Sequence, residues 1–145
     1  MDGQVIIISA PSGTGKSMWI AELVAKERIG GRSVHVCSAA KTYEAFLQYV
    51  REHFSRDNTR FPSPVSLLTL FGPADIFALE DVDIFLSGRE NTQKEFAHII
   101  VETAHEGKKI YLTGIDLQGR TEHFHETITR CCSNLKIYTS VNRSK

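Results

Sequence analysis

The sequence predicts an α/β fold of three layers, in which a mostly parallel sheet of about five strands has helices on both faces. Short apolar runs alternate with amphipathic segments along the chain, which is the pattern of strands joined by crossover helices. Glycines and prolines separate many of these segments. With 145 residues, the chain is long enough for one hydrophobic core, so we expect a single domain over residues 1–145.

The first half of the chain should contain two strands and two helices in alternation. Short apolar runs predict the strands, and apolar residues at helical spacing predict the helices. The first helix should end at Gly30 and Gly31, because glycine adopts the left-handed helix cap at little cost. Thr42 is the expected N-cap of the second helix. The expected ranges are 4–9 and 33–37 for the two strands and 42–54 for the second helix.

The second half should continue the alternation after a polar loop over 55–64. Residues 65–71 are apolar without clear alternation, so a short buried helix and a strand are both possible, and we favour the helix. A capping box of Thr92 and Glu95 should begin a longer helix that ends at Gly107. Its expected inner face is Phe96, Ile99, Ile100 and Ala104. The remaining expected elements are strands at 76–79, 109–113 and 135–139 and a helix at 121–131.

The composition is that of an ordinary globular protein. It argues against a membrane-spanning protein, a disulfide-rich protein and a protein that attracts nucleic acid by its overall charge. The 17 basic residues balance the 17 acidic ones, so any contact with nucleic acid must be local. No apolar run could span a membrane and the first residues do not resemble a signal peptide, so we expect a cytoplasmic protein. The three cysteines should be reduced thiols, and the histidines lack the spacing of a zinc site.

A glycine-rich stretch, A-P-S-G-T-G-K-S at residues 10–17, lies between the first predicted strand and the first predicted helix. Such a turn points several backbone N–H groups at one spot, with the positive end of the helix dipole behind them, so it binds phosphate. Lys16 should contact the outer phosphates of a nucleotide, and the Ser17 hydroxyl should be a ligand of Mg²⁺. The expected nucleotide-binding residues are Pro11, Ser12, Gly13, Thr14, Gly15, Lys16, Ser17 and Met18.

Acidic residues follow the apolar strand predicted at 76–79. In a parallel sheet the carboxyl ends of the strands meet at one edge, so Glu80, Asp81 and Thr113 should lie near the phosphate-binding loop. Glu80 and Asp81 are the candidate carboxylates for Mg²⁺ and for catalysis, and Asp83 follows shortly after them. If Asp81 holds the metal, Val82 takes the place of an acid that would orient the attacking water, and hydrolysis should be slow.

The segment that follows these acids resembles one family. Residues 85–98 read F-L-S-G-R-E-N-T-Q-K-E-F-A-H, and residues 105–110 read H-E-G-K-K-I. They are similar to the ATPase domain of DnaA-type bacterial replication initiators, which has F-L-x-G-[KR], then T-Q-x-E-F-F-H, then L-H-x-x-G-K after an acidic strand end. Residues 43–51 also resemble the family segment F-x-x-x-F-x-x-x-[IV]-R.

That resemblance implies a P-loop NTPase core of the AAA+ type that binds ATP with Mg²⁺. It also implies that Thr113 is the polar residue of the first sensor and that Asp116 matches the aspartate shortly after it. The implied partners are a replication initiator or other protein and single-stranded DNA, contacted under the control of the bound nucleotide. The related short regulators of DnaA, which bind the initiator rather than the origin, have a similar shape.

The chain also departs from the initiators. The segment that contacts adenine, the helical lid and the helix-turn-helix domain of that family are not among its residues. Ala10 and Pro11 replace the first two glycines of the family loop, and Arg130 stands about two residues before the expected arginine finger. These departures favour weak ATP hydrolysis or none, and they do not favour assembly into an active filament.

Two alternative functions remain open from the sequence. Residues 107–117, G-K-K-I-Y-L-T-G-I-D-L, also resemble the strand of thymidine-kinase-type enzymes that ends in G-L-D, although the zinc ribbon and lasso loop of those enzymes are missing. A scaffold that binds ATP without turnover is the other alternative. Residues 85–108 are explained only by the DnaA resemblance.

Overall fold

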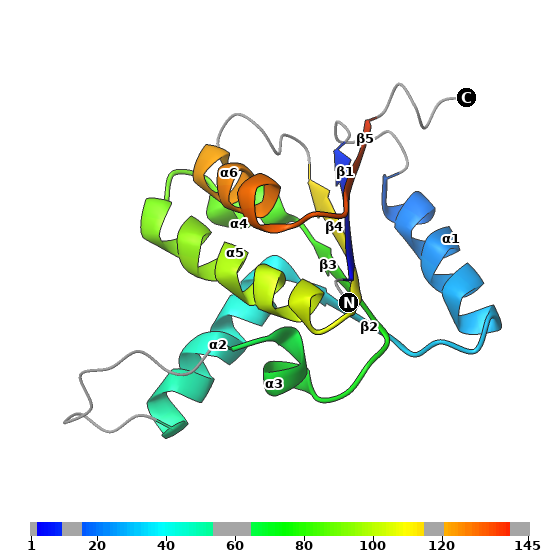
Figure 1. Cartoon of the computed structure of the whole chain (residues 1–145), viewed down its shortest axis with the longest axis horizontal. Helices are drawn as coiled ribbons and strands as arrows, with labels where there is room; N and C mark the ends of the chain where they lie inside the picture. Colours follow the sequence, from blue (N-terminus) through cyan, green and yellow to red (C-terminus); the bar gives the residue numbers. More distant parts are fainter. Residues whose placement is uncertain (1–2, 10–15, 54–64, 115–120, 140–145) are drawn as a thin grey trace.

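The fold is built on a sheet of five parallel strands in the order β2-β3-β4-β1-β5 (Figure 1). The structure is a computed structural model that describes residues 3–9, 16–53, 65–114 and 121–139. The strands are β1 (Gln4–Ser9), β2 (Val34–Ser38), β3 (Ile76–Glu80), β4 (Lys109–Gly114) and β5 (Leu135–Thr139). The predicted parallel sheet is therefore confirmed, and every strand lies within one residue of its predicted range.

Helices cover both faces of this sheet, as predicted (Figure 1). The helix α1 covers one face, where its Ile20 and Val24 pack against Ile6, Ile8 and Tyr111 of the strands. The other helices lie on the opposite face and form the larger part of the core with side chains such as Phe77 and Phe96. The helices are α1 (Lys16–Ile29), α2 (Ala39–His53), α3 (Leu67–Phe71), α4 (Val82–Leu86), α5 (Glu90–His105) and α6 (Glu122–Cys131).

The helix ends agree with the sequence prediction where glycine decides them. Gly31 and Gly107 follow α1 and α5, and both have a positive φ, as the left-handed cap requires. The predicted inner face of α5 is buried. Residues 67–71 form the favoured short helix, whose first N–H, that of Leu67, donates to the Thr103 hydroxyl of α5 at 2.8 Å.

The two predicted N-caps are wrong. The helix α2 begins at Ala39, and the Ser38 hydroxyl accepts a hydrogen bond from the N–H of Lys41 at 3.1 Å, so Ser38 occupies the capping position. Thr42 lies inside the helix, where its hydroxyl donates to the carbonyl oxygen of Ser38 at 2.9 Å. The capping box proposed for Thr92 fails in the same way, because α5 begins two residues earlier, at Glu90.

One element was not predicted. The helix α4 starts directly after Asp81 and has only five residues, which is too short for a periodic apolar pattern. Val82 and Leu86 of this helix pack in the core beside the sheet. The helix therefore buries Asp83, which the sequence grouped with Glu80 and Asp81.

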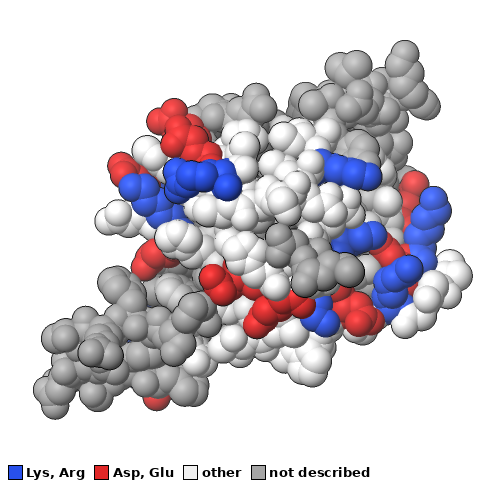
Figure 2. All heavy atoms as spheres, in the orientation of Figure 1, with Lys and Arg blue, Asp and Glu red and all other residues white. Residues whose placement is uncertain are grey.

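Charged side chains of both signs lie on the face drawn in Figure 2. Figure 2 shows Lys and Arg side chains interspersed with Asp and Glu on the visible face, in agreement with the balanced composition. Within the described ranges, no helix combines the length and the apolarity that crossing a membrane requires.

Candidate functional site

The candidate site lies at the edge of the sheet where the strands end. The strand β1 ends at Ser9 and α1 begins at Lys16, so the residues predicted to bind phosphate lie between an inner strand of the sheet and the helix that covers one face. The predicted loop residues Pro11, Ser12, Gly13, Thr14 and Gly15 lie outside the described residues. Lys16 and Ser17 are placed by their backbone in the first turn of α1, and Met18 next to them is 68% exposed.

The strand register brings Thr113 and Glu80 to this edge. Ile8 of β1 pairs with Thr113 of β4, and Leu112 of β4 pairs with Leu79 of β3. Thr113 and Glu80 therefore each come one residue after the paired residues Leu112 and Leu79, so they lie at the same level of the sheet. Since neighbouring strands lie about 4.8 Å apart, the ends of β1, β4 and β3 fall within about 10 Å of one another.

The alternation of side chains assigns Glu80 and Thr113 to one face of the sheet. On β3, Ile76 and Ala78 pack in the cluster under α1, and Phe77 and Leu79 pack in the core on the opposite side. Glu80 continues the first series, so it belongs to the face that α1 covers. Tyr111 packs under α1 as well, and Thr113 follows it by two residues.

The three acids that the sequence grouped together have different surroundings. Glu80 ends β3 and is half-buried, whereas Asp81 is exposed and Asp83 is fully buried in α4. Asp81 has φ 61° and ψ 41°, a left-handed conformation that non-glycine residues adopt at some cost. The backbone adopts this conformation at the turn into α4. Asp81 therefore does not continue the extended backbone of β3.

The donor set at this edge fits magnesium better than zinc. Carboxylate and hydroxyl oxygens are the ligands that Mg²⁺ prefers, and Glu80, Asp81 and Ser17 supply oxygen donors. Among the described residues, no group of three or more His, Cys, Asp and Glu side chains is arranged to hold a metal ion. A magnesium ion held between a nucleotide and one or two carboxylates does not need such a group.

Of the two further residues that the family resemblance pointed to, Arg130 is among the described residues and Asp116 is not. Arg130 lies exposed in the last turn of α6. Asp116 lies outside the described residues. The Nε2 atom of His123 in α6 lies 3.7 Å from the Oε1 atom of Glu90 in α5.

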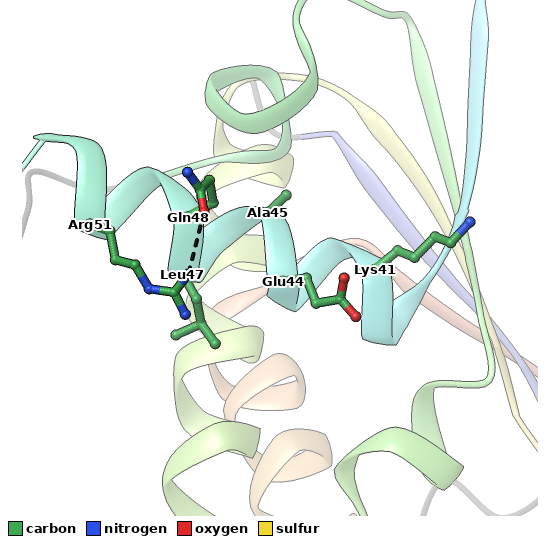
Figure 3. A pocket seen from close by; sticks show the side chains of 6 residues that line it. All are labelled: Lys41, Glu44, Ala45, Leu47, Gln48 and Arg51. Carbon is green, nitrogen blue, oxygen red and sulfur yellow. Dashed lines mark hydrogen bonds between the residues drawn. The ribbon is translucent and has the colours of Figure 1, made fainter.

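An open groove of about 500 Å³ runs along the exposed face of α2 (Figure 3). Lys41 lies near one end of the groove and Arg51 near the other, with Glu44 and Leu47 between them. The Arg51 side chain donates to the Oε1 atom of Gln48 at 3.3 Å. The groove thus offers two cations and one exposed apolar side chain on a helix that begins at the same edge as the candidate site.

Sequence reasoning missed Gln93, a buried residue on the inner face of α5. Its amide nitrogen donates to the carbonyl oxygen of Leu86 at 3.1 Å, and its amide oxygen accepts from the N–H of Phe124 at 3.0 Å. Gln93 thereby joins α4, which follows the acidic residues, to α6. The signal was present, because Gln93 lies three residues before Phe96 and shares the helical spacing of the inner face.

Solved structures of DnaA have the same fold as this chain. A replication initiator DnaA bound to AMPPCP and single-stranded DNA matches with a TM-score of 0.66 and 22% identity over 94% of this chain. AMPPCP-bound DnaA from Aquifex aeolicus matches with a TM-score of 0.62 and 22% identity over 95%. Domain III of the DnaA protein from Thermotoga maritima matches with a TM-score of 0.65 and 17% identity over 93%.

These likenesses confirm the predicted α/β P-loop NTPase fold and, at the level of the fold, the resemblance to the AAA+ domain of DnaA. The chain spans 40% to 53% of the length of the matched chains. No protein-family model matches the sequence. No curated protein matches it either.

Proposed function

We propose that this chain is an ATP-binding module of the DnaA type that acts in the initiation or regulation of DNA replication. The observation that carries the proposal is the strand order. Because β4 lies between β1 and β3, Thr113 is placed between the strand that leads into the phosphate-binding loop and the strand that ends in Glu80. A phosphate-binding loop, a polar side chain and a carboxylate on one sheet edge are the groups needed to hold a nucleotide triphosphate.

Within this proposal, the residues of the loop and α1 bind the phosphates. The backbone N–H groups of residues 12–17 and the Lys16 ammonium neutralise the triphosphate, and the Ser17 hydroxyl contributes to holding Mg²⁺. The metal, when bound, supplies charge neutralisation between the outer phosphates. Thr113 offers a hydroxyl, one strand away from the loop strand, that can contact the outer phosphate or an attacking water.

Glu80 is our first choice for the metal carboxylate, and Asp81 is the second. Glu80 belongs to the face that α1 covers, and α1 starts at the end of the phosphate-binding loop. Asp81 lies beyond the strand, at the turn into α4. With Glu80 on the metal, Asp81 is the next carboxylate along the chain that could orient water. Because the left-handed turn into α4 takes Asp81 out of the line of β3, we propose that ATP hydrolysis is slow.

Binding of the nucleotide is tested by isothermal titration of the purified chain with MgATP. Lys16→Ala should abolish measurable binding, because it removes the charge that pairs with the outer phosphates. The control is Lys26→Ala, which removes an exposed lysine from the last turn of the same helix and should bind like the wild type. An unchanged titration in Lys16→Ala would show that the loop is not the site. Phosphorylation of thymidine by the wild-type chain would instead support the kinase alternative.

For the partner, we propose single-stranded DNA or an initiator protein, contacted under nucleotide control. The support comes from the DnaA structure that holds AMPPCP and single-stranded DNA, and from the groove along α2 with its two cations (Figure 3). In fluorescence anisotropy with a labelled single strand, MgATP should strengthen binding, and Arg51→Ala should weaken it about threefold to tenfold. Equal anisotropy with and without ATP, together with no complex with an initiator in sizing chromatography, would contradict this part of the proposal.

A further inference from the structure

A second pocket opens at the opposite edge of the sheet, where the strands begin. It has a volume of about 340 Å³ and is lined by Arg32, Asp75, Ile76, Gly107, Lys108 and Lys109. The lining residues come from the turn before β2, the start of β3 and the turn between α5 and β4. The six residues of β1 span about 20 Å, so this pocket is distinct from the phosphate-binding loop at the far end of the strands.

The charges around this pocket are arranged by a buried carboxylate. Glu27 of α1 accepts hydrogen bonds from Arg32 at 3.0 Å, from Lys109 at 2.8 Å and from the Tyr111 hydroxyl at 2.9 Å. These contacts hold the Arg32 and Lys109 side chains at the pocket, while more than half of the Arg32 side chain remains exposed. A guanidinium has five N–H donors and an ammonium three, so both cations keep donors for a ligand.

Lys108 supplies a third cation from a fixed piece of backbone. Its carbonyl oxygen accepts a hydrogen bond from the N–H of Gln4 at 3.1 Å, which ties the turn to the start of β1. Gly3 packs so closely against Lys108 that a Cβ there would lie 1.9 Å from the carbonyl oxygen of Lys108. The backbone of Lys108 is therefore held by the segment that leads into β1.

Asp75 is the one acid among the lining residues, and one of its carboxylate oxygens already accepts hydrogen bonds from Ser33. Its Oδ2 atom accepts hydrogen bonds from the N–H of Ser33 at 2.9 Å and from the Ser33 hydroxyl at 3.3 Å. The hydrogen bonds from the N–H and then the hydroxyl of Ser33, followed by the Lys108 and Arg32 charges, hold the pKa of Asp75 below its ordinary value. With Glu27 and Asp75 both ionised, the three cations leave the pocket with an excess of one positive charge.

We propose that this pocket binds a phosphate group through Arg32, Lys108 and Lys109. A forked guanidinium beside two ammonium groups matches a tetrahedral dianion, which accepts several charge-assisted hydrogen bonds at once. The volume exceeds that of a bare phosphate and falls in the range of small-molecule sites, so a phosphomonoester fits as well as free phosphate. The site is separate from the proposed nucleotide site and does not depend on it.

The test is an NMR titration of the ¹⁵N-labelled chain at constant ionic strength, with inorganic phosphate in one series and glycerol 3-phosphate in the other. Saturable shifts of the backbone amides of Arg32 and residues 107–109 support the proposal, and the series that saturates at lower concentration identifies free phosphate or the monoester as the better ligand. Phosphate at the loop is recognised separately, because it shifts the amides of residues 12–17. Sodium chloride in place of phosphate should leave the amides of residues 107–109 unchanged.

Two variants of Lys108 and one control variant show whether the cations bind the phosphate. Lys108→Ala should weaken the saturable shifts on the order of tenfold, as expected for the loss of one charge-assisted contact. Lys26→Ala, which removes an exposed lysine that is not among the lining residues, should have no effect. Lys108→Gln repeats the test with a side chain of similar length, and unchanged ¹⁵N spectra away from the pocket show that both variants fold. Shifts that do not saturate, that chloride reproduces, or that Lys108→Ala leaves intact would overturn the proposal.

Discussion

Glu27 is a buried carboxylate that binds two cationic side chains and a tyrosine hydroxyl. It is 8% exposed, and its carboxylate accepts hydrogen bonds from Lys109, Tyr111 and Arg32. The hydrogen bond from Lys109 is the largest cause that holds its pKa below the ordinary value, and it outweighs the opposing effect of burial. A buried carboxylate with this set of partners stabilises the folded chain only while it is ionised.

We predict that Glu27→Gln lowers the free energy of unfolding by about 1–3 kcal/mol at neutral pH, because the amide cannot pair with two cations. Since the folded-state pKa is lowered, the contribution of Glu27 is present above the unfolded-state pKa of about 4.3 and is lost as the pH falls through the folded-state value. Urea unfolding at neutral pH and at about pH 3.5 should therefore show a difference from wild type that shrinks in acid.

The control for this prediction is Glu22→Gln, which removes an exposed carboxylate from the same helix and should change stability little at either pH. A loss in Glu27→Gln that is the same at both pH values would mean that the side chain contributes by packing and not by its charge.

At the residue scale, the sequence predicted the glycines that end helices but not the residues that cap their starts. The glycines that end α1 and α5 could be identified because only a positive φ fits there. The caps at Thr42 and Thr92 could not, because several polar residues near each helix start can serve and the backbone path selects among them. The pairing of Glu27 with Lys109 joins residues 82 positions apart, so no local pattern indicates it.

At the element scale, the buried side-chain amide of Gln93 hydrogen-bonds backbone groups at the end of one helix and at the start of another. It donates to the carbonyl oxygen of Leu86, the last residue of α4, and accepts from an N–H in the first turn of α6. Such terminal groups have no partner within their own helix. The N-cap residue of α6, Thr121, makes no side-chain cap of its own. Gln93 thus fixes both helices relative to α5.

We predict that Gln93→Met lowers the free energy of unfolding by about 1–3 kcal/mol, because a side chain of similar size removes both hydrogen bonds. The N–H of Phe124 then loses its Gln93 acceptor, and the carbonyl oxygen of Leu86 keeps the bond from the N–H of Arg89 at 3.2 Å. Hydrogen exchange should become faster in the first turn of α6, measured at the amide of Phe124. Gln48→Met on the exposed face of α2 should leave both quantities near their wild-type values. Unchanged exchange at Phe124 would contradict the capping role.

Elements were predictable in proportion to their length and burial. The inner strands β1, β3 and β4 are largely apolar runs that are buried on both faces of the sheet, so their limits follow from the sequence to within one residue. The edge strands β2 and β5 are less buried, and their limits agree equally well. The five residues of α4 complete little more than one turn, and their apolar side chains fit a strand or loop equally well.

At the scale of the whole molecule, the sheet order decides which candidate residues can act together. The sequence placed the loop, Glu80 and Thr113 at one edge, because all parallel strands end there. It could not tell which strands are neighbours, and this decides the distances between the groups. The structure adds that β4 lies between β1 and β3, and that Glu80 belongs to the face under α1. The choice between Glu80 and Asp81, open in the sequence, thereby becomes testable.

We predict that MgATP raises the melting temperature of the wild-type chain more than ATP with EDTA does, and that Glu80→Gln removes this difference. A ligand that binds only the folded state stabilises it by about 2.7 kcal/mol at a hundred times its Kd, so the shift reports affinity directly. Losing a metal carboxylate should weaken MgATP on the order of tenfold, which lowers that stabilisation by about 1.4 kcal/mol.

The matched variant for this prediction is Asp81→Asn, which changes the neighbouring carboxylate but leaves Glu80 in place. It should keep most of the magnesium-dependent shift and reduce the release of phosphate from ATP instead, because Asp81 is assigned to water and not to the metal. Both variants should melt like the wild type without nucleotide, since neither carboxylate is fully buried. If Asp81→Asn abolishes the shift and Glu80→Gln retains it, the turn into α4 brings Asp81 to the metal, and the alternation along β3 does not determine which acid binds it.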